Sequence, residues 1–330
     1  MHTIFDNRPV PAECRGAVVA IGNYDGVHRG HQRLLADARE EAARRGVPFG
    51  VVTFEPHPRT FFRPDQPVFR ITPAEMKVRL LRGCGADFVS ILTFDRTLAS
   101  KEAETFVREE LVGRLAVSHV ITGYDFHFGK GRKGSPDLMM RLGRDLGFSV
   151  TVVDQVTDDS GVAPFASSAI RQELRHGAVE IAAEQLGYRW TILATVVPGD
   201  QRGRTLGFPT INVKLDDGCE PGEGIYAVRV RRGETVWRGA GYIGKRPTFG
   251  KTDVVLEVFL LNFSGDLYGE QLAIEFIAYI RGDKAFADVE ALTAQMEKDV
   301  AEIDRVLARV DADDPIARFP LGKLQVEGRL

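Results

Sequence analysis

The sequence has few of the features that mark membrane, exported or nucleic-acid-binding proteins. No apolar run approaches the ~20 residues that a membrane-spanning helix needs. No basic segment followed by an apolar core lies near the N-terminus, so a signal peptide is not expected. The formal net charge is −3, and a solvated strand edge explains the arginine cluster near Arg229. We therefore expect a cytoplasmic protein without membrane or nucleic-acid partners.

Cysteine is also scarce. Cys14, Cys84 and Cys219 lie far apart and form no metal-binding or redox motif, which indicates reduced thiols. What is present is an ordinary globular composition, with 330 residues of which 44% are hydrophobic. A chain of this length is enough for about two domains, each with its own core.

A glycine-rich loop with two histidines stands out in the first half. An apolar run over 18–21 leads into this loop, and a helical apolar pattern follows it. Such a strand–loop–helix unit presents backbone N–H groups and a helix dipole to phosphate. His28 and His31 can share one side of the first helical turn and donate hydrogen bonds to anionic oxygens. The alternatives are solvated histidines or, less favoured for want of further ligands, a zinc site.

Strands and helices alternate through about residue 186, which predicts a doubly wound parallel sheet. Ligands bind such sheets at the carboxyl ends of the strands, and the unusual loops here all follow predicted strands. One loop is stiffened by Pro56 and Pro58 and continues into Phe62, so it suits either a flat heteroaromatic ligand or a plain capping role. Another, over 123–134, mixes aromatic rings, Asp125 and cations, and its spacing is not that of a P-loop.

A third feature opens a short predicted helix near residue 167. Ser167 and Ser168 suit helix N-caps. The functional interpretation is that these hydroxyls, together with Arg171, hold phosphates at the helix N-terminus. The sequence alone leaves both interpretations open.

From residue 187 the pattern changes to short β-rich segments and a long amphipathic helix over 288–310. This pattern predicts a small β-barrel with a C-terminal helix packed on it. The fold class is therefore α/β plus all-β. We predict domains over 1–186 and 187–310 and a loosely ordered, Asp- and Pro-rich tail over 311–330.

The predicted barrel carries its own candidate site. Glycines and arginines over 199–207 can wrap a polyphosphate through backbone N–H groups. Thr210 and Asn212 alternate along an extended strand, so they point to one side, and their oxygens suit Mg²⁺. Glu257 lies in an otherwise apolar strand, where it either faces solvent or acts as a general base.

Together these motifs resemble the prokaryotic bifunctional riboflavin kinase/FAD synthetase family. The resemblance spans about 15–307 and rests on six motifs, which lie at 22–31, 53–58, 123–129, 207–212, 244–249 and 266–269. The histidine motif alone defines only the adenylyltransferase superfamily, but its combination with the barrel motif at 207–212 is specific. The family implies that the C-terminal module phosphorylates riboflavin with ATP to give FMN. The N-terminal module then transfers AMP from a second ATP to FMN, giving FAD and pyrophosphate.

The resemblance also implies residue roles. Glu257 would take the proton from the ribityl hydroxyl, while Thr210 and Asn212 would hold Mg²⁺ on ATP. In the second reaction the nucleophile is already a phosphate anion, so His28 and His31 would only stabilise charge at the α-phosphate and the leaving pyrophosphate. Further cofactor ligands would be Gly22, Asn23, Asp25, Ser168, Arg171, Gly203, Arg204 and Phe208. The isoalloxazine ring would be framed by Pro56, Pro58, Phe62, Asp125 and Phe128.

The sequence departs from the family pattern at a few positions. Tyr24 stands where Phe is usual, Ala166 removes one hydroxyl of the serine motif, Ser168 replaces its Thr, and Phe259 replaces a frequent His. We expect both activities to survive these changes.

Two rival functions stay open. The first is an enzyme with one active module and a barrel that only regulates, against which the intact Thr210, Asn212 and Glu257 argue. The second is a flavin-sensing protein, which would bind flavin without releasing ADP. The sequence leaves self-association open.

Overall fold

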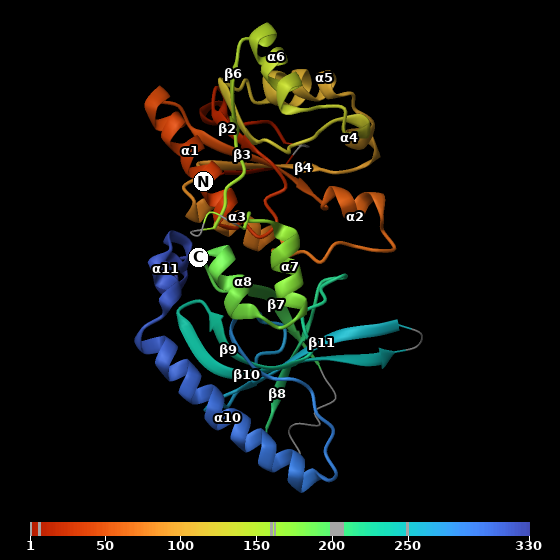
Figure 1. The fold of residues 1–330 in the computed structure, drawn as a ribbon, viewed down its shortest axis with the longest axis vertical. Helices are drawn as coiled ribbons and strands as arrows, with labels where there is room; N and C mark the ends of the chain where they lie inside the picture. The colour runs from red at the N-terminus through yellow and green to blue at the C-terminus, as the bar shows by residue number, and fades with distance from the viewer. Residues whose placement is uncertain (1, 6–7, 159–160, 162, 199–207, 249–250) are drawn as a thin grey trace. The chain divides into compact units, whose positions relative to one another are not determined.

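The computed structural model describes the chain except for residues 1, 6–7, 159–160, 162, 199–207 and 249–250 (Figure 1). It divides into two compact units. The first comprises Met1–Val68 and Lys77–Ala166, and the second comprises Phe69–Met76 and Ser167–Leu330. Gly203 and Arg204, two of the predicted ligands, lie outside the described residues.

The first unit is built on a six-stranded parallel sheet, which confirms the predicted α/β class. Its strand order is β1-β4-β3-β2-β5-β6. The inner strands are apolar and buried almost throughout, as expected for a sheet covered on both faces. The strands are β1 (His2–Phe5), β2 (Val18–Ile21), β3 (Phe49–Glu55), β4 (Phe88–Thr93), β5 (His119–Gly123) and β6 (Ser149–Val153).

The helical segments of this unit connect the strands. Ser135 caps α6 by accepting the backbone N–H of Leu138, and Gly147 ends it with φ 86°. Those are the start and stop signals expected from Ser-Pro and Gly. The segments are η1 (Ala12–Cys14), α1 (Arg29–Arg45), α2 (Pro58–Phe62), α3 (Ala74–Gly83), α4 (Arg96–Ser100), α5 (Ala103–Phe106), the π-helical η2 (Val107–Arg114), η3 (Lys130–Arg132) and α6 (Pro136–Leu146).

The sheet order creates a topological switch point beside β2. This strand pairs with β3 on one side and with β5 on the other. The connection after β2 runs to β3 on one side, whereas the connection after β5 runs to β6 on the other side. A crevice is therefore expected between the carboxyl ends of β2 and β5. The loop over 22–28, which we call the histidine loop, begins there.

The second unit contains a closed antiparallel barrel, as predicted, with strand order β10-β11-β8-β7-β12-β9. Ile303 and Leu307 of the long helix α10 pack on barrel residues that include Ala227 and Ile277. The strands are β7 (Thr191–Val197), β8 (Thr210–Lys214), β9 (Gly224–Arg232), β10 (Thr235–Thr248), β11 (Lys251–Leu260) and β12 (Gln271–Arg281). The helical segments are α7 (Ser167–Arg175), α8 (Val179–Leu186), α10 (Val289–Ala312), η4 (Pro315–Arg318) and α11 (Pro320–Val326).

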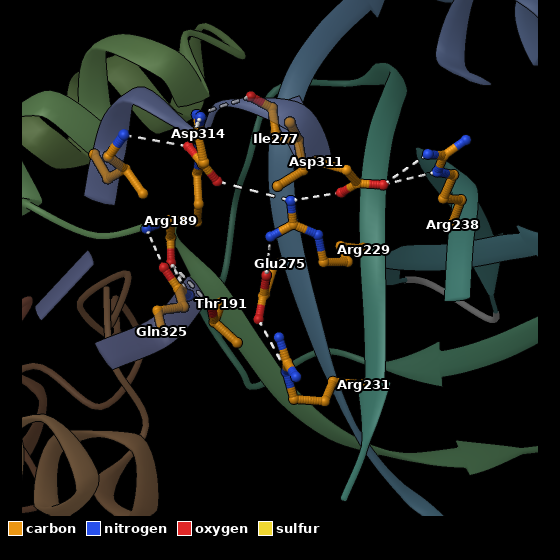
Figure 2. Close-up of polar contacts among 11 residues, drawn as sticks. Arg189, Thr191, Arg229, Arg231, Arg238, Glu275, Ile277, Asp311, Asp314 and Gln325 are labelled. Carbon is orange, nitrogen blue, oxygen red and sulfur yellow. Dashed lines mark hydrogen bonds and ion pairs between the residues drawn. The ribbon is translucent and has the colours of Figure 1, made fainter. Parts of the chain in front are cut away.

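Residues 311–330 are not the loosely ordered tail that their composition suggested. They continue α10 and then form η4 and α11, with Ile316 and Leu321 buried. The side chain of Gln325 accepts the backbone N–H of Arg189 at 2.6 Å and donates to Thr191 Oγ1 at 2.9 Å (Figure 2). Aspartates and prolines end the long helix here, but the segment that follows has partners far away in the sequence.

The same segment completes a buried ion-pair network on the barrel (Figure 2). Arg189 donates to Asp314 at 2.7 Å. Arg229 lies 3.2 Å from Glu275 and 2.9 Å from Asp311. Arg229 is itself buried, so the explanation as a solvated strand edge is wrong for this residue. Burial raises the pKa of Glu275 although the neighbouring arginines oppose the rise.

Candidate active sites

The histidine loop ends in a histidine cap. His28 is the N-cap of α1, and its Nδ1 accepts the backbone N–H of His31 at 3.3 Å. Because Nδ1 is the acceptor, the neutral ring carries its proton on Nε2. His28 thus has a ring N–H donor at the positive end of a helix of 17 residues.

His31 lies directly against His28, as the spacing predicted. The two imidazole rings are nearly parallel, and their centroids are 3.7 Å apart. The rings of Tyr24 and His31 pack edge to face, with a centroid distance of 5.3 Å. Tyr24 in turn lies over Gly22, where a Cβ would approach its ring to 3.2 Å. Gly22 therefore permits the close packing that holds the histidine pair.

The electrostatics of His31 favour the neutral ring. Burial, assisted by the positive charge of Lys77, lowers the pKa of His31 to about 3. Its Nδ1 is buried and has no hydrogen-bond partner among the residues that the structure describes. At neutral pH this imidazole can serve as a hydrogen-bonding group but supplies no positive charge.

A buried lysine below the loop was missed by sequence reasoning. Lys77 Nζ lies 2.7 Å from Glu55 Oε1 and donates to the backbone oxygen of Asn23 at 3.2 Å. The available signal was its place on α3 close to the buried Leu80 and Leu81, where a charged residue is unusual. That pattern gives no hint of its partner.

The predicted flavin-framing residues fall at the two ends of a chain of aromatic contacts. Phe62 is 64% exposed, whereas Phe128 is buried. The contacts run between them through Phe94, Phe54 and Phe106, with successive centroid distances of 5.7, 6.1, 6.4 and 5.7 Å. Phe62 thus lies at the exposed end of this chain of contacts, while Phe128 belongs to the core.

The other members of that predicted set lie nearby in sequence. Pro58 begins α2, which His57 caps by accepting the backbone N–H of Arg59 at 3.2 Å. Pro56 precedes this cap, and Asp125 is exposed in the loop after β5. Asp25, in contrast, is buried in the histidine loop.

The serine and arginine candidates belong to the second unit. Ser167 and Ser168 occupy the first turn of α7. Arg171, one turn further along, donates from Nε to the backbone oxygen of Phe69 at 2.7 Å. The guanidinium therefore has a fixed anchor within its own unit.

The predicted kinase residues meet on the barrel. In the antiparallel pair of β8 and β11, Asn212 stands opposite Glu257. Thr210, two residues earlier, donates from Oγ1 to Glu257 Oε2 at 3.3 Å. The buried Leu256 and Val258 alternate with Glu257, so the three polar side chains share the face away from the barrel core.

Tyr242 is a further residue at this face that the sequence did not indicate. It stands opposite Glu257 on β10, and its hydroxyl donates to Asp283 Oδ2 at 3.3 Å. Burial and the nearby carboxylates, Asp283 first among them, raise the pKa of Tyr242. Phe208 packs edge-on against Phe259 at 5.2 Å, beside Thr210.

The donor set on this face fits Mg²⁺. Thr210 and Asn212 supply neutral oxygens, and Glu257 places a carboxylate next to them. A hard cation that keeps water and phosphate as its main ligands needs few such protein oxygens. Among the described residues, no group of three or more His, Cys, Asp or Glu side chains is arranged to hold a metal.

Comparison with known proteins shows which class of enzyme the chain belongs to. Residues 10–164 match the family model for FAD synthetase, and residues 186–307 match that for riboflavin kinase. The chain thus joins a nucleotidyltransferase domain to a kinase domain. It is 40% identical over 285 residues to the bifunctional riboflavin kinase/FMN adenylyltransferase of Escherichia coli (strain K12), covering 86% of this chain and 90% of that protein. The chain belongs to this bifunctional riboflavin kinase/FMN adenylyltransferase family, which confirms the resemblance seen in the sequence.

Two further matches cover more of this chain. The protein of the same name from Bacillus subtilis (strain 168) is 34% identical over 317 residues, covering 94% of this chain and 98% of its own. A solved structure described as a macrolide-efflux protein from Streptococcus pneumoniae has a TM-score of 0.79 and 28% identity, covering 91% of this chain and 98% of its own.

Within the part of the chain that the structure describes, no helix combines the length and apolar character needed to cross a membrane.

Proposed function

We propose that each of the two reactions is performed by the residues of one candidate site. The barrel face around Glu257 phosphorylates riboflavin, and the histidine loop after β2 transfers AMP to FMN. The observation that supports the barrel assignment most directly is the 3.3 Å contact between Thr210 Oγ1 and Glu257 Oε2, with Asn212 opposite. A carboxylate and two neutral oxygen donors are what a kinase site requires.

In the kinase reaction, Glu257 accepts the proton of the ribityl hydroxyl as that oxygen attacks the γ-phosphate. Thr210 and Asn212 would hold Mg²⁺, which neutralises phosphate charge when bound. Thr210 also orients the Glu257 carboxylate through its hydrogen bond. We assign Gly203, Arg204 and Phe208 to ATP or flavin binding by family resemblance.

In adenylyl transfer, the phosphate of FMN attacks the α-phosphate of ATP, so the site needs charge stabilisation and no general base. His28 offers its Nε2–H group as a hydrogen-bond donor at the N-terminus of α1, where the helix dipole also favours an anion. His31 adds a neutral imidazole. The roles of Gly22, Asn23, Asp25, Ser168 and Arg171 in binding ATP follow the family resemblance.

The flavin ring of FMN is assigned to Pro56, Pro58, Phe62, Asp125 and Phe128. The exposure of Phe62 supports its own assignment. Phe128 would act from the core, by shaping the loop that carries Asp125. A cytoplasmic location and a boundary between functional domains near residue 187 complete the proposal.

The test is product analysis with the purified full chain, riboflavin, ATP and Mg²⁺. FMN and ADP should form first, followed by FAD and pyrophosphate. FMN without FAD would favour an enzyme with one active module. Flavin binding without ADP release would favour a sensor, and either result would overturn the proposal.

A further inference from the structure

Lys77 is a buried cation whose contacts converge on the start of the histidine loop. The residue is only 4% exposed, and a buried ammonium group is costly unless it is paired and hydrogen-bonded. Glu55, at the end of β3, provides the pairing charge at 2.7 Å. The pair therefore lies at the carboxyl edge of the parallel sheet, where the loop after β2 also begins.

Further contacts of Lys77 join two segments. Nζ donates to the Asn23 oxygen at 3.2 Å and lies 3.4 Å from the Phe54 oxygen and 3.3 Å from Thr53 Oγ1. Thr53 Oγ1 itself donates to the Asn23 oxygen at 3.1 Å. The carbonyl of Asn23 thus receives two donors, one from α3 and one from β3.

The loop that follows Asn23 needs such support because its backbone is strained. Tyr24 has φ 50° and Val27 has φ 38°, values in the left-handed region that non-glycine residues rarely adopt. A β-branched residue such as Val27 is especially disfavoured there. Strained backbone persists only where surrounding contacts hold it, and this strained stretch immediately precedes His28.

We propose that Lys77, paired with Glu55, is a positioning residue for adenylyl transfer. Its ammonium group fixes the Asn23 carbonyl and thereby the strained turn that presents His28 and His31 to the phosphates of ATP. This inference rests on the proposed function of the two histidines. Lys77 acts through the loop and touches no reacting atom.

The first test replaces Lys77 with Met and compares both activities of the full chain. FMN adenylylation should lose about 10- to 100-fold in kcat with a smaller change in KM for ATP, since misplacement of catalytic groups acts on the chemical step. Riboflavin phosphorylation, measured on the same preparation, should stay within about twofold because its residues lie in the other unit. The matched control is Lys101→Met, which removes a lysine paired with Glu109 and Glu110 in the same unit.

A second variant separates positioning from simple stabilisation. The double variant Lys77→Met with Glu55→Leu removes both charges, so no unpaired carboxylate is left behind. If the pair only stabilises the fold, the double variant should regain adenylyl transfer along with thermal stability. We expect it to regain stability and remain slow, because the Asn23 carbonyl keeps only the Thr53 donor and still lacks the Lys77 ammonium group. Recovery of adenylyl transfer would overturn the proposal.

Thr53→Val tests the same carbonyl without changing charge or size. It should lower adenylyl transfer several-fold in kcat, and unchanged activity in both Thr53→Val and Lys77→Met would overturn the proposal. His31→Ala, run in parallel, distinguishes the two levels of the argument. If His31→Ala is fully active, the proposed function of the loop fails; if His31→Ala is inactive while Lys77→Met is normal, only the present inference fails.

Discussion

His28 accepts the backbone N–H of His31 at 3.3 Å while its ring stacks on the His31 ring at a centroid distance of 3.7 Å. One side chain therefore both caps the helix and belongs to the candidate site. The geometry of the histidine pair depends on the cap, and a change at residue 28 affects stability and chemistry together. These two effects can be separated by choosing the substitution.

His28→Asn and His28→Ala should differ in stability but not in chemistry. Asn is a good N-cap residue, whereas Ala loses the cap at a cost of about 1 kcal/mol in the free energy of unfolding. Both lack the Nε2 donor, so FMN adenylylation should fall about 100- to 1,000-fold in kcat. Urea unfolding and steady-state kinetics measure the two effects. Normal adenylyl transfer by His28→Asn would refute the donor role.

Glu257→Gln should stop riboflavin phosphorylation while sparing the second reaction. The amide keeps the size of the side chain but cannot take a proton, which predicts a fall of about 10²- to 10⁴-fold in kcat. FMN supplied directly should still become FAD at the normal rate. Chromatography of the flavin products measures both steps, and normal FMN formation from riboflavin would exclude Glu257 as the base.

The lowered pKa of His119 predicts how the stability of the fold responds to acid. Burial, helped by Arg45 and Arg44, lowers its pKa to about 4, and its ring nitrogens contact Ser149 Oγ at 2.6 Å and Thr151 Oγ1 at 3.0 Å. The unfolded chain binds this proton from about pH 6.5 and the folded chain only near pH 4, so stability should fall as the pH drops through this window.

The contribution of His119 is measured by unfolding in urea at pH 7.5 and pH 4.5. The shift from 6.5 to about 4 corresponds to a loss of roughly 3 kcal/mol at most. His119→Asn should make the free energy of unfolding less dependent on pH than it is in the unchanged chain. Equal pH dependence in the variant and the unchanged chain would contradict the assignment.

Asp314→Asn should destabilise the barrel strongly. It leaves the buried Arg189 without its charge partner at 2.7 Å, a type of change that costs about 3–5 kcal/mol. The control Asp304→Asn breaks an exposed pair with Arg238 and should cost less than about 1 kcal/mol. Chemical denaturation followed by tryptophan fluorescence compares the two, and similar losses would contradict the burial argument.

Local signals were sufficient for much of the fold. Alternating strands and helices predicted the parallel sheet, and short β-rich segments predicted the barrel. The spacing of His28 and His31 placed them together, and the alternation of Thr210 and Asn212 placed both on one face. These patterns depend on neighbours within one helical turn or one strand, which a sequence displays directly.

The misses share a different cause. The tail was expected to be loose because it is rich in Asp and Pro, yet its Asp314 binds Arg189, which lies 125 residues away in the sequence. Lys77 meets Asn23 and Glu55 only after α3 packs on the sheet edge. Such pairings are tertiary contacts between residues far apart in the sequence, so no local pattern predicts them.

The network in Figure 2 also sets an order of events during synthesis. Arg189 and Arg229 emerge from the ribosome long before Asp311, Asp314 and Gln325, the residues that bind them. Until those partners are made, closing the barrel would bury guanidinium groups that lack part of their compensation, which is unfavourable. The kinase unit is therefore expected to complete its folding after the adenylyltransferase sheet, although it catalyses the earlier reaction.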